Sequence, residues 1–230
     1  MTEPVTLVLE DAAALAARAA DEVLGAAAEA LAARGSFSIA VSGGNTPRDT
    51  YRALARRGAE TDFARWDVFL ADERVVAADD ERSNGRLVRE TLLAGAGPPP
   101  PRFHSVPTEL GDPAAVARAY ERELRATLER FDLVLLGVGD DGHTASLFPG
   151  DPALEEAEHW VAPARIGSDL PRVTLTYPAL ASARRIVLLA RGAEKRDALR
   201  AVLAGEDRPL ARVRSAAPPL WLVERSAWPG

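Results

Sequence analysis

Short apolar runs alternate along this chain with longer amphipathic or alanine-rich segments, which predicts strands separated by helices. The apolar runs predict strands at residues 5–9, 36–41, 66–71, 103–106, 133–138, 159–164, 172–176, 185–190 and 220–223, with a connection at 165–171. The segments between them predict helices at residues 12–34, 48–57, 83–93, 112–130 and 193–203. This alternation indicates an α/β fold, with a doubly wound, mostly parallel sheet and helices on both faces, in a Rossmann-like three-layer arrangement. At 230 residues we expect a single domain over 1–230.

Capping residues indicate where the first two helices begin and end. Asp11 can cap the alanine-rich first helix, and Gly35 ends it. Thr46 is expected to cap the second helix, with Pro47 at its first position. The glycine- and proline-rich stretch 95–101 predicts an extended connection rather than a domain boundary.

The apolar run at 133–138 stops abruptly at glycines, two aspartates and a histidine. No polar residue interrupts the run, which is typical of a strand buried on both faces in the middle of a parallel sheet. Ligands of such sheets bind outside the carboxyl ends of the strands. Because Asp140, Asp141 and His143 fall at such an end, the segment predicts a functional site.

A second turn, from Ser42 to Pro47, leads from a strand into a helix and contains two adjacent glycines, Gly43 and Gly44. Glycines let the backbone turn its N–H groups toward one point, at the positive end of the helix dipole. That arrangement binds phosphate. The turn lacks both the lysine of a Walker loop and the glycine spacing of a dinucleotide motif. A plain tight turn is the alternative, and the local sequence leaves both interpretations open.

Asp72, Glu73 and Arg74 follow the apolar run at 66–71. Two carboxylates and an arginine at the carboxyl end of a strand could take part in a reaction if the turn that binds phosphate lies beside them. A structural ion pair accounts for them equally well.

Charge and composition narrow the range of partners. The formal net charge of −6 argues against nucleic acid and anionic membranes, which both require a broad basic surface. The sequence has no apolar run of bilayer-spanning length and no basic-then-apolar amino terminus, so we expect no membrane association and a cytoplasmic protein. The absence of cysteine excludes disulfides, thiolate metal sites and cysteine nucleophiles.

Lys195 is the single lysine among 28 basic residues. In a chain that otherwise uses arginine throughout, a remaining lysine indicates a site that needs a compact ammonium group rather than a guanidinium fork. A residual surface lysine is the alternative.

His143 is the best candidate for a general base. His104 and His159 adjoin aromatic residues in strand-like segments, which indicates structural or surface positions. An imidazole titrates near neutral pH and can take a proton from water as the water attacks a carbonyl. With no Gly-x-Ser-x-Gly elbow and no cysteine, water is the remaining nucleophile. A histidine that only lines the turn is the alternative.

Two other uses of the same segment are disfavoured. Asp140, Asp141 and His143 crowd three potential ligands into four residues without a further histidine cluster, so we expect no metal. Residues 137–142 satisfy Gly-x-Gly-x-x-Gly, but two aspartates would face a pyrophosphate and proline breaks any following helix. We therefore expect no nicotinamide or flavin binding, and no cofactor.

Residues 131–150 closely resemble the signature of the 6-phosphogluconolactonase family, whose members open the lactone ring of 6-phosphogluconolactone in the pentose phosphate pathway. Further segments resemble the other blocks of this family, in the family's order: 42–47, 71–74 with 83–84, 171–176 and 192–195. The resemblance covers nearly the whole chain. It implies membership in the glucosamine/galactosamine-6-phosphate isomerase superfamily and a sugar-phosphate lactone as substrate, and we expect a monomer.

The resemblance also implies roles for individual residues. His143 is expected to be the general base that activates water, and Asp141 or Asp72 to orient it. The residues expected to bind the substrate and its phosphate are Ser42, Gly43, Gly44, Asn45, Thr46, Arg74, Arg172 and Lys195. Arg74 is also the first choice for stabilising the tetrahedral oxyanion. The family more often has serine at the position of Asn45, so the contacts of that side chain are open.

Two other functions remain to be weighed. Aminosugar-phosphate deaminases, which resemble distant relatives, share the Asp-Gly-His core but continue with Phe-Asn-Glu, where this chain has Ser146, Leu147 and Phe148. Their helper carboxylate is therefore missing here. A sugar-phosphate sensor without catalysis is the other alternative, and the intact Asp141-Gly-His143 core counts against it.

We expect Lys195 and His143 to affect different kinetic parameters. Lys195→Ala should raise KM far more than it lowers kcat, because the ammonium group would hold the phosphate in both ground and transition states. His143→Ala should lower kcat by about 10²- to 10⁴-fold with little change in substrate binding. Steady-state kinetics on 6-phosphogluconolactone check this, and equal effects of both variants on both parameters would contradict it.

Overall fold

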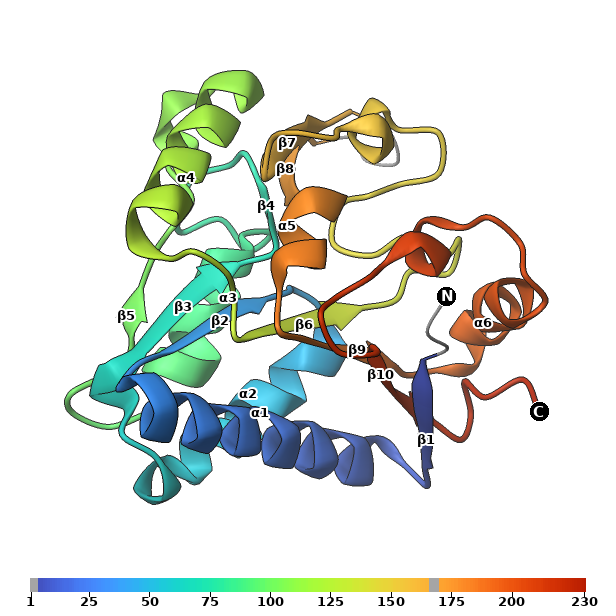
Figure 1. Cartoon of the computed structure of the whole chain (residues 1–230), viewed down its shortest axis with the longest axis horizontal. Helices are drawn as coiled ribbons and strands as arrows, with labels where there is room; N and C mark the ends of the chain where they lie inside the picture. Colours follow the sequence, from blue (N-terminus) through green and yellow to red (C-terminus); the bar gives the residue numbers. More distant parts are fainter. Residues whose placement is uncertain (1–3, 166–169) are drawn as a thin grey trace.

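The computed structural model describes residues 4–165 and 170–230 (Figure 1). Its main sheet has seven strands in the order β1-β10-β9-β6-β2-β3-β5, and all neighbouring strands in it are parallel. These strands are β1 (Val5–Leu9), β2 (Phe37–Val41), β3 (Trp66–Leu70), β5 (Arg102–Phe103), β6 (Leu133–Gly137), β9 (Arg185–Ala190) and β10 (Leu220–Glu224).

A second, smaller sheet carries the order β4-β8-β7 and is antiparallel. It consists of β4 (Asp72–Arg74), β7 (Val161–Ala164) and β8 (Arg172–Leu175). The sequence predicted residues 72–74 as the polar end of β3. Instead they leave the main sheet and pair with β8, which brings Arg74 opposite Arg172.

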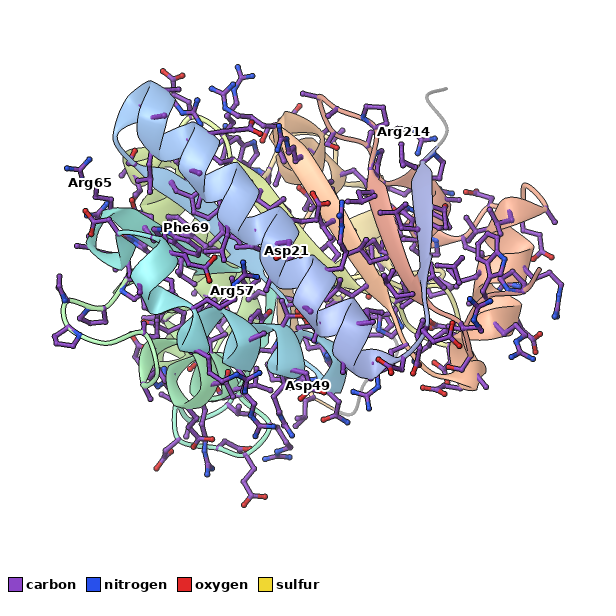
Figure 2. All side chains as sticks on the ribbon, turned by 90° about the horizontal axis from the view of Figure 1, so that it is seen from below. Asp21, Asp49, Arg57, Arg65, Phe69 and Arg214 are labelled. Atoms are coloured by element: carbon purple, nitrogen blue, oxygen red, sulfur yellow. The ribbon has the colours of Figure 1, made fainter. Side chains whose placement is uncertain are left out.

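Helices cover both faces of the main sheet, as the sequence predicted (Figure 1). On one face lie α1 (Ala12–Arg34) and α2 (Asn45–Arg56); on the other lie α4 (Pro113–Thr127), α5 (Tyr177–Ser182) and the second sheet. Figure 2 shows α1 and α2 from outside, where an ion pair of 2.6 Å joins Arg57 to Asp21. The remaining helices are α3 (Asn84–Val88), which continues as a π-helical turn (Arg89–Leu93), and α6 (Arg196–Leu203). The doubly wound, mostly parallel α/β architecture is therefore confirmed.

The central strands are buried because their apolar runs face helices or the second sheet on both sides. Residues 133–136 of β6 are fully buried. On the α1 side, most of the buried helix positions are alanines, which allow the helix to approach the sheet closely. On the other side, the hydroxyl of Tyr120 in α4 accepts from Leu70 N at 2.7 Å and donates to Leu70 O at 3.0 Å. Helices on both faces are thus fixed to the sheet.

The strand order reverses between β2 and β6. From β2 the chain proceeds outward to β3 and β5, and then returns through α4 to place β6 on the other side of β2. Val41 of β2 lies opposite Leu135 of β6, so the two strands end at the same edge. Such a reversal opens a crevice at the carboxyl ends, where open α/β sheets bind their ligands.

Several element boundaries differ from the predictions. The first residue of α2 is Asn45, with Gly44 as its N-cap at φ 105°, so Thr46 lies inside the first turn and does not cap it. The short helix α5 was not predicted; its Pro178 marks a helix start that the apolar pattern does not reveal. The helix expected to end at Arg130 ends at Thr127. The strand expected at 103–106 is reduced to a two-residue pairing with β3.

Residues 1–3 of the amino terminus and part of the expected connection 165–171 lie outside the described residues. No helix in the described part of the chain combines the length and the apolar character that a membrane span requires.

Two glycines associated with α1 should respond oppositely to alanine. Gly35 ends the helix with φ 75°, so Gly35→Ala should lower the free energy of unfolding by about 1 kcal/mol through left-handed backbone strain. Gly25 lies exposed inside α1, and an added Cβ there would point into open space, so Gly25→Ala should raise the free energy of unfolding by about 0.5–1 kcal/mol. Urea titration of both variants measures the pair; a stabilising Gly35→Ala would contradict the assignment.

Candidate active site

A cavity of about 180 Å³ opens at the carboxyl edge of the main sheet, at the reversal between β2 and β6. Two glycine-rich turns and several charged side chains form its walls. The lining residues are Ser42, Gly43, Gly44, Asp72, Arg74, Asn84, Gly137, Val138, Gly139, His143, Ala145 and Arg172. The turn after β2 and the imidazole after β6 therefore face one shared space.

Three residues expected to bind phosphate lie outside this cavity. Asn45 and Thr46 line a neighbouring cavity of about 410 Å³, together with Gly192 and Glu194. Lys195 follows Glu194 on the turn before α6, and it is half-buried. It is absent from the lining of both cavities among the described residues.

His143 forms a hydrogen-bonded pair with Asp141. The imidazole Nδ1 lies 2.6 Å from Asp141 Oδ1, and the same oxygen accepts from the backbone N–H of His143 at 2.9 Å. Burial disfavours the charged carboxylate, but the backbone hydrogen bond and the charge on His143 outweigh it, so the pKa of Asp141 lies below its usual value. An ionised carboxylate at Nδ1 keeps the proton on that nitrogen. Nε2 is therefore the ring nitrogen available to a ligand.

The turn around His143 is closed by its own backbone. Gly139 N donates to His143 O at 2.8 Å, and a Cβ at Gly139 would overlap the imidazole. On its other side the imidazole packs against Phe148, with ring centroids 4.4 Å apart. Glycine on one side and phenylalanine on the other leave the ring little freedom to rotate.

Asp72 lies apart from this pair. Its Oδ2 accepts from Ser146 Oγ at 2.6 Å, and its Oδ1 accepts from Asn84 Nδ2 at 3.2 Å. Within the described residues it makes no hydrogen bond to His143. Of the two carboxylates considered for orienting the imidazole, Asp141 is the one in contact.

Arg74 and Arg172 face each other across the β4–β8 ladder. Like charges in this position destabilise a sheet. Burial lowers the pKa of Arg172, and the charge of Arg74 lowers it further, while the negative charges of Asp72 and Glu73 oppose this shift. Asp72 Oδ2 lies 3.8 Å from Arg172 Nη1. The Nε atoms of both arginines are buried and have no hydrogen-bond partner within the described residues. Because both arginines line the cavity, an anion there would meet two positive charges.

The turn after β2 offers further donors. No side chain caps α2, so the first N–H groups of this helix are open to a ligand. The buried Oγ of Ser42 also lacks a partner within the described residues. The backbone here is held in place, because Tyr51 donates its hydroxyl to Ser42 O at 2.5 Å and a Cβ at Gly43 would overlap Asn84.

Sequence reasoning missed three residues of this site. Asn84 was placed in a segment that resembles the family and at the start of a helix, without a role in the site, yet it lines the cavity. Ser146 and Phe148 lie in the signature segment and were noted as a difference from deaminases, again without a role. Ser146 donates to Asp72, and the Phe148 ring packs against His143 and lies with its centroid 5.6 Å from the guanidinium carbon of Arg172. Nothing in the local sequence signals these roles, since each depends on a partner from another element.

Asp140, Asp141 and His143 place one potential ligand atom each within 4.8 Å of one another. Asp140 is exposed, and exposed acidic groups often gather in this way without an ion. Nδ1 of His143 is already engaged by Asp141. That this turn holds no metal stays a prediction.

Comparison with known proteins links this site to described families. The family described as "Glucosamine-6-phosphate isomerases/6-phosphogluconolactonase" matches residues 10–222. A 6-phosphogluconolactonase of Rhizobium meliloti (strain 1021) is 39% identical over 226 residues, which cover 93% of this chain and 95% of the relative. One of Synechocystis sp. is 38% identical over 210 residues, which cover 86% of each chain.

A solved structure resembles the fold over nearly its full length. The crystal structure of 6-phosphogluconolactonase from Thermotoga maritima has a TM-score of 0.84 and 31% sequence identity, and the match covers 96% of this chain and 99% of that one.

The close packing of Gly139 against His143 can be tested directly. Gly139→Ala should displace the imidazole and break its hydrogen bond to Asp141, because the added Cβ has no room. In NMR spectra, the low-field Nδ1 proton of His143, assigned with His143→Gln, should disappear in Gly139→Ala. Gly25→Ala is the control for a glycine change in open space. An unchanged resonance in Gly139→Ala would contradict the packing.

Proposed function

This chain belongs to the family of glucosamine-6-phosphate isomerases and 6-phosphogluconolactonases, and from that premise we propose that it hydrolyses 6-phospho-D-glucono-1,5-lactone to 6-phosphogluconate in the oxidative pentose phosphate pathway. The main support for the proposal is that His143 and the turn Ser42–Gly44 line the same cavity. One hexose derivative can then hold its phosphate at one wall and present its ester to the other.

In this proposal the 6-phosphate binds at the turn 42–44 and the N-terminus of α2. The backbone N–H groups there and the uncapped helix end favour an anion. Arg74 and Arg172 both line the cavity, and they supply positive charge to the phosphate and to the developing oxyanion. In this proposal Asn45, Thr46 and Lys195 complete the phosphate site from the side of the neighbouring cavity. Asn45 and Thr46 line that cavity together with Glu194, the residue before Lys195, and the lysine side chain is long and flexible.

The chemistry follows from the Asp141–His143 pair. Nε2 of His143 takes a proton from a water molecule as the water oxygen attacks C1 of the lactone. The carbonyl becomes a tetrahedral oxyanion, which collapses when the bond from C1 to the ring oxygen breaks. The imidazolium returns its proton to that ring oxygen, which leaves a hydroxyl group and a new carboxylic acid. Ionised Asp141 stabilises the imidazolium in between, as its hydrogen bond to Nδ1 supports.

Phe148 supports hydrolysis over aminosugar deamination. Its position in the resemblance matches the helper carboxylate of the deaminases, and here the side chain is apolar and 4% exposed. The nearby Asp72 does not replace that carboxylate, because Ser146 and Asn84 engage both of its oxygens. A sensor function is disfavoured by the oriented base, which phosphate binding alone does not require.

The experiment measures the activity of the purified wild-type protein and of two variants, each with one of two adjacent aspartates replaced by asparagine. The wild-type protein should consume freshly made 6-phosphogluconolactone faster than buffer, with EDTA present, and should release no ammonia from glucosamine 6-phosphate. Asp141→Asn should lower kcat by about 10²-fold or more, because the imidazole loses the acceptor that holds its tautomer. Asp140→Asn is the matched control: this exposed neighbour should leave kcat nearly unchanged.

Three outcomes would count against the proposal. Lactone consumption at the rate of buffer would exclude the activity, and ammonia release would favour the deaminase. Equal effects of the two aspartate variants would remove Asp141 as the orienting group. The monomeric state, the cytoplasmic location and the independence from metals and cofactors stay predictions.

A further inference from the structure

Glu73 is a buried carboxylate that the proposed mechanism does not use. It sits next to Arg74 in β4, but alternate residues of a strand point to opposite sides, so Glu73 faces away from the cavity. Its side chain is 3% exposed. Burial raises the pKa of Glu73, while the hydrogen bonds that it accepts oppose that rise. A carboxylate in such a place requires a full set of donors.

Four donors meet this carboxylate, and all belong to β4 or to the beginning of α3. Oε1 accepts from the backbone N–H groups of Arg74 at 2.7 Å and Asn84 at 2.8 Å; Oε2 accepts from Gly85 N at 2.7 Å and Ser83 Oγ at 2.9 Å. Glu73 therefore fastens the N-terminus of α3 to the short strand β4.

The residue fastened in this way is Asn84, which is 2% exposed and lines the cavity. Its Nδ2 donates to the backbone O of Asp72 at 2.9 Å and to Asp72 Oδ1 at 3.2 Å. Its Oδ1 accepts from Arg74 Nη1 at 2.8 Å. It also packs against Gly43, where a Cβ has no room. One amide group thus contacts three residues that line the cavity, two from β4 and one from the turn after β2.

Arg74 needs such a restraint because it lies opposite Arg172. Repulsion between the two guanidinium groups favours a rotamer that takes one of them out to water. Nη1 of Arg74 is held by Asn84 Oδ1 and by the backbone O of Arg82 at 2.7 Å. The negative charge of Asp72, whose Oδ2 lies 3.8 Å from Arg172 Nη1, and to a smaller extent that of Glu73 attract Arg172 and so offset part of the repulsion.

We propose that Glu73 and Asn84 are positioning residues, which hold the Arg74 guanidinium at the cavity wall so that it meets the anionic substrate without rearrangement. This inference rests on the proposed function, in which Arg74 binds the substrate. Neither residue takes part in proton transfer. Their contribution reaches the substrate through Arg74, and it vanishes when Arg74 is absent.

A double-mutant cycle tests this dependence. Asn84→Ser should lower kcat/KM by about 10- to 100-fold, mainly through KM, since a misplaced binding group costs about this much. In the Arg74→Ala background, the same substitution should lower kcat/KM by less than about threefold, because contacting residues are not additive. The same loss in both backgrounds would overturn the proposal, since it would mean that Asn84 acts on the substrate directly or only on the fold.

Two further variants separate positioning from folding. Tyr120→Phe removes a buried hydroxyl that bonds Leu70 and lies away from the cavity, so it should lower the urea midpoint but leave kcat/KM within about twofold. Glu73→Gln presents an NH₂ group to donors that need acceptors, and it should reproduce the coupling to Arg74. If Glu73→Gln does not fold, the Asn84→Ser cycle decides alone.

The inference can fail separately from the proposed function. If the wild-type protein does not hydrolyse the lactone, the same cycle is measured as binding of inorganic phosphate by calorimetry. Coupling between Asn84 and Arg74 in phosphate affinity would support the positioning role without the enzyme activity. Additive losses in phosphate affinity would overturn it whether or not the lactone is hydrolysed.

Discussion

The parallel pairing of β2 with β6 is the constraint on which the site depends. The two strands lie far apart in the chain, yet Val41 lies opposite Leu135, so both strands stop at one edge of the sheet. Because the strand order reverses between them, the segments that follow diverge and leave a crevice. The glycine turn of β2 and the imidazole turn of β6 border this crevice.

The second sheet adds what the main sheet cannot provide. The turns that follow the strands of a parallel sheet lie at its carboxyl edge, but the main sheet does not place two long cationic side chains opposite each other. The antiparallel pairing of β4 with β8 does so by placing Arg74 opposite Arg172. Because both arginines line the cavity, their two positive charges favour the binding of an anion there. A binding site with donors already aimed at the ligand gains affinity because little rearrangement remains on binding.

The Asp141–His143 pair, by contrast, is assembled almost entirely within one turn. Asp141 and His143 are two residues apart, and the backbone of the same turn closes around them. Phe148 packs against the ring from the far side, and Leu210 N donates to Gly142 O at 3.0 Å. Two side chains in one short segment keep their mutual geometry even if the surrounding sheets shift slightly. The groups proposed to bind the substrate come from several elements and depend on how those elements are joined, as the contacts of Glu73 and Asn84 indicate.

Local sequence was sufficient where short-range physics decides the outcome. The uninterrupted apolar run at 133–138 predicted a buried strand, which is β6, and the glycine-rich residues after it predicted a turn, in which His143 lines the cavity. Even so, Thr46 was assigned as the cap of α2, although Gly44, two residues earlier, takes that position and the helix begins at Asn45. Tertiary structure alone decided that Asp141 and not Asp72 contacts His143. It also decided that Asn45, Thr46 and Lys195 do not line the main cavity in the described part of the chain. The contributions of Asn84 and Phe148 to the site likewise depend on contacts between elements. Backbone propensities act over a few residues and can be recognised in sequence, whereas contacts between elements depend on strand register and packing, where a shift of one residue reverses which side chains face each other.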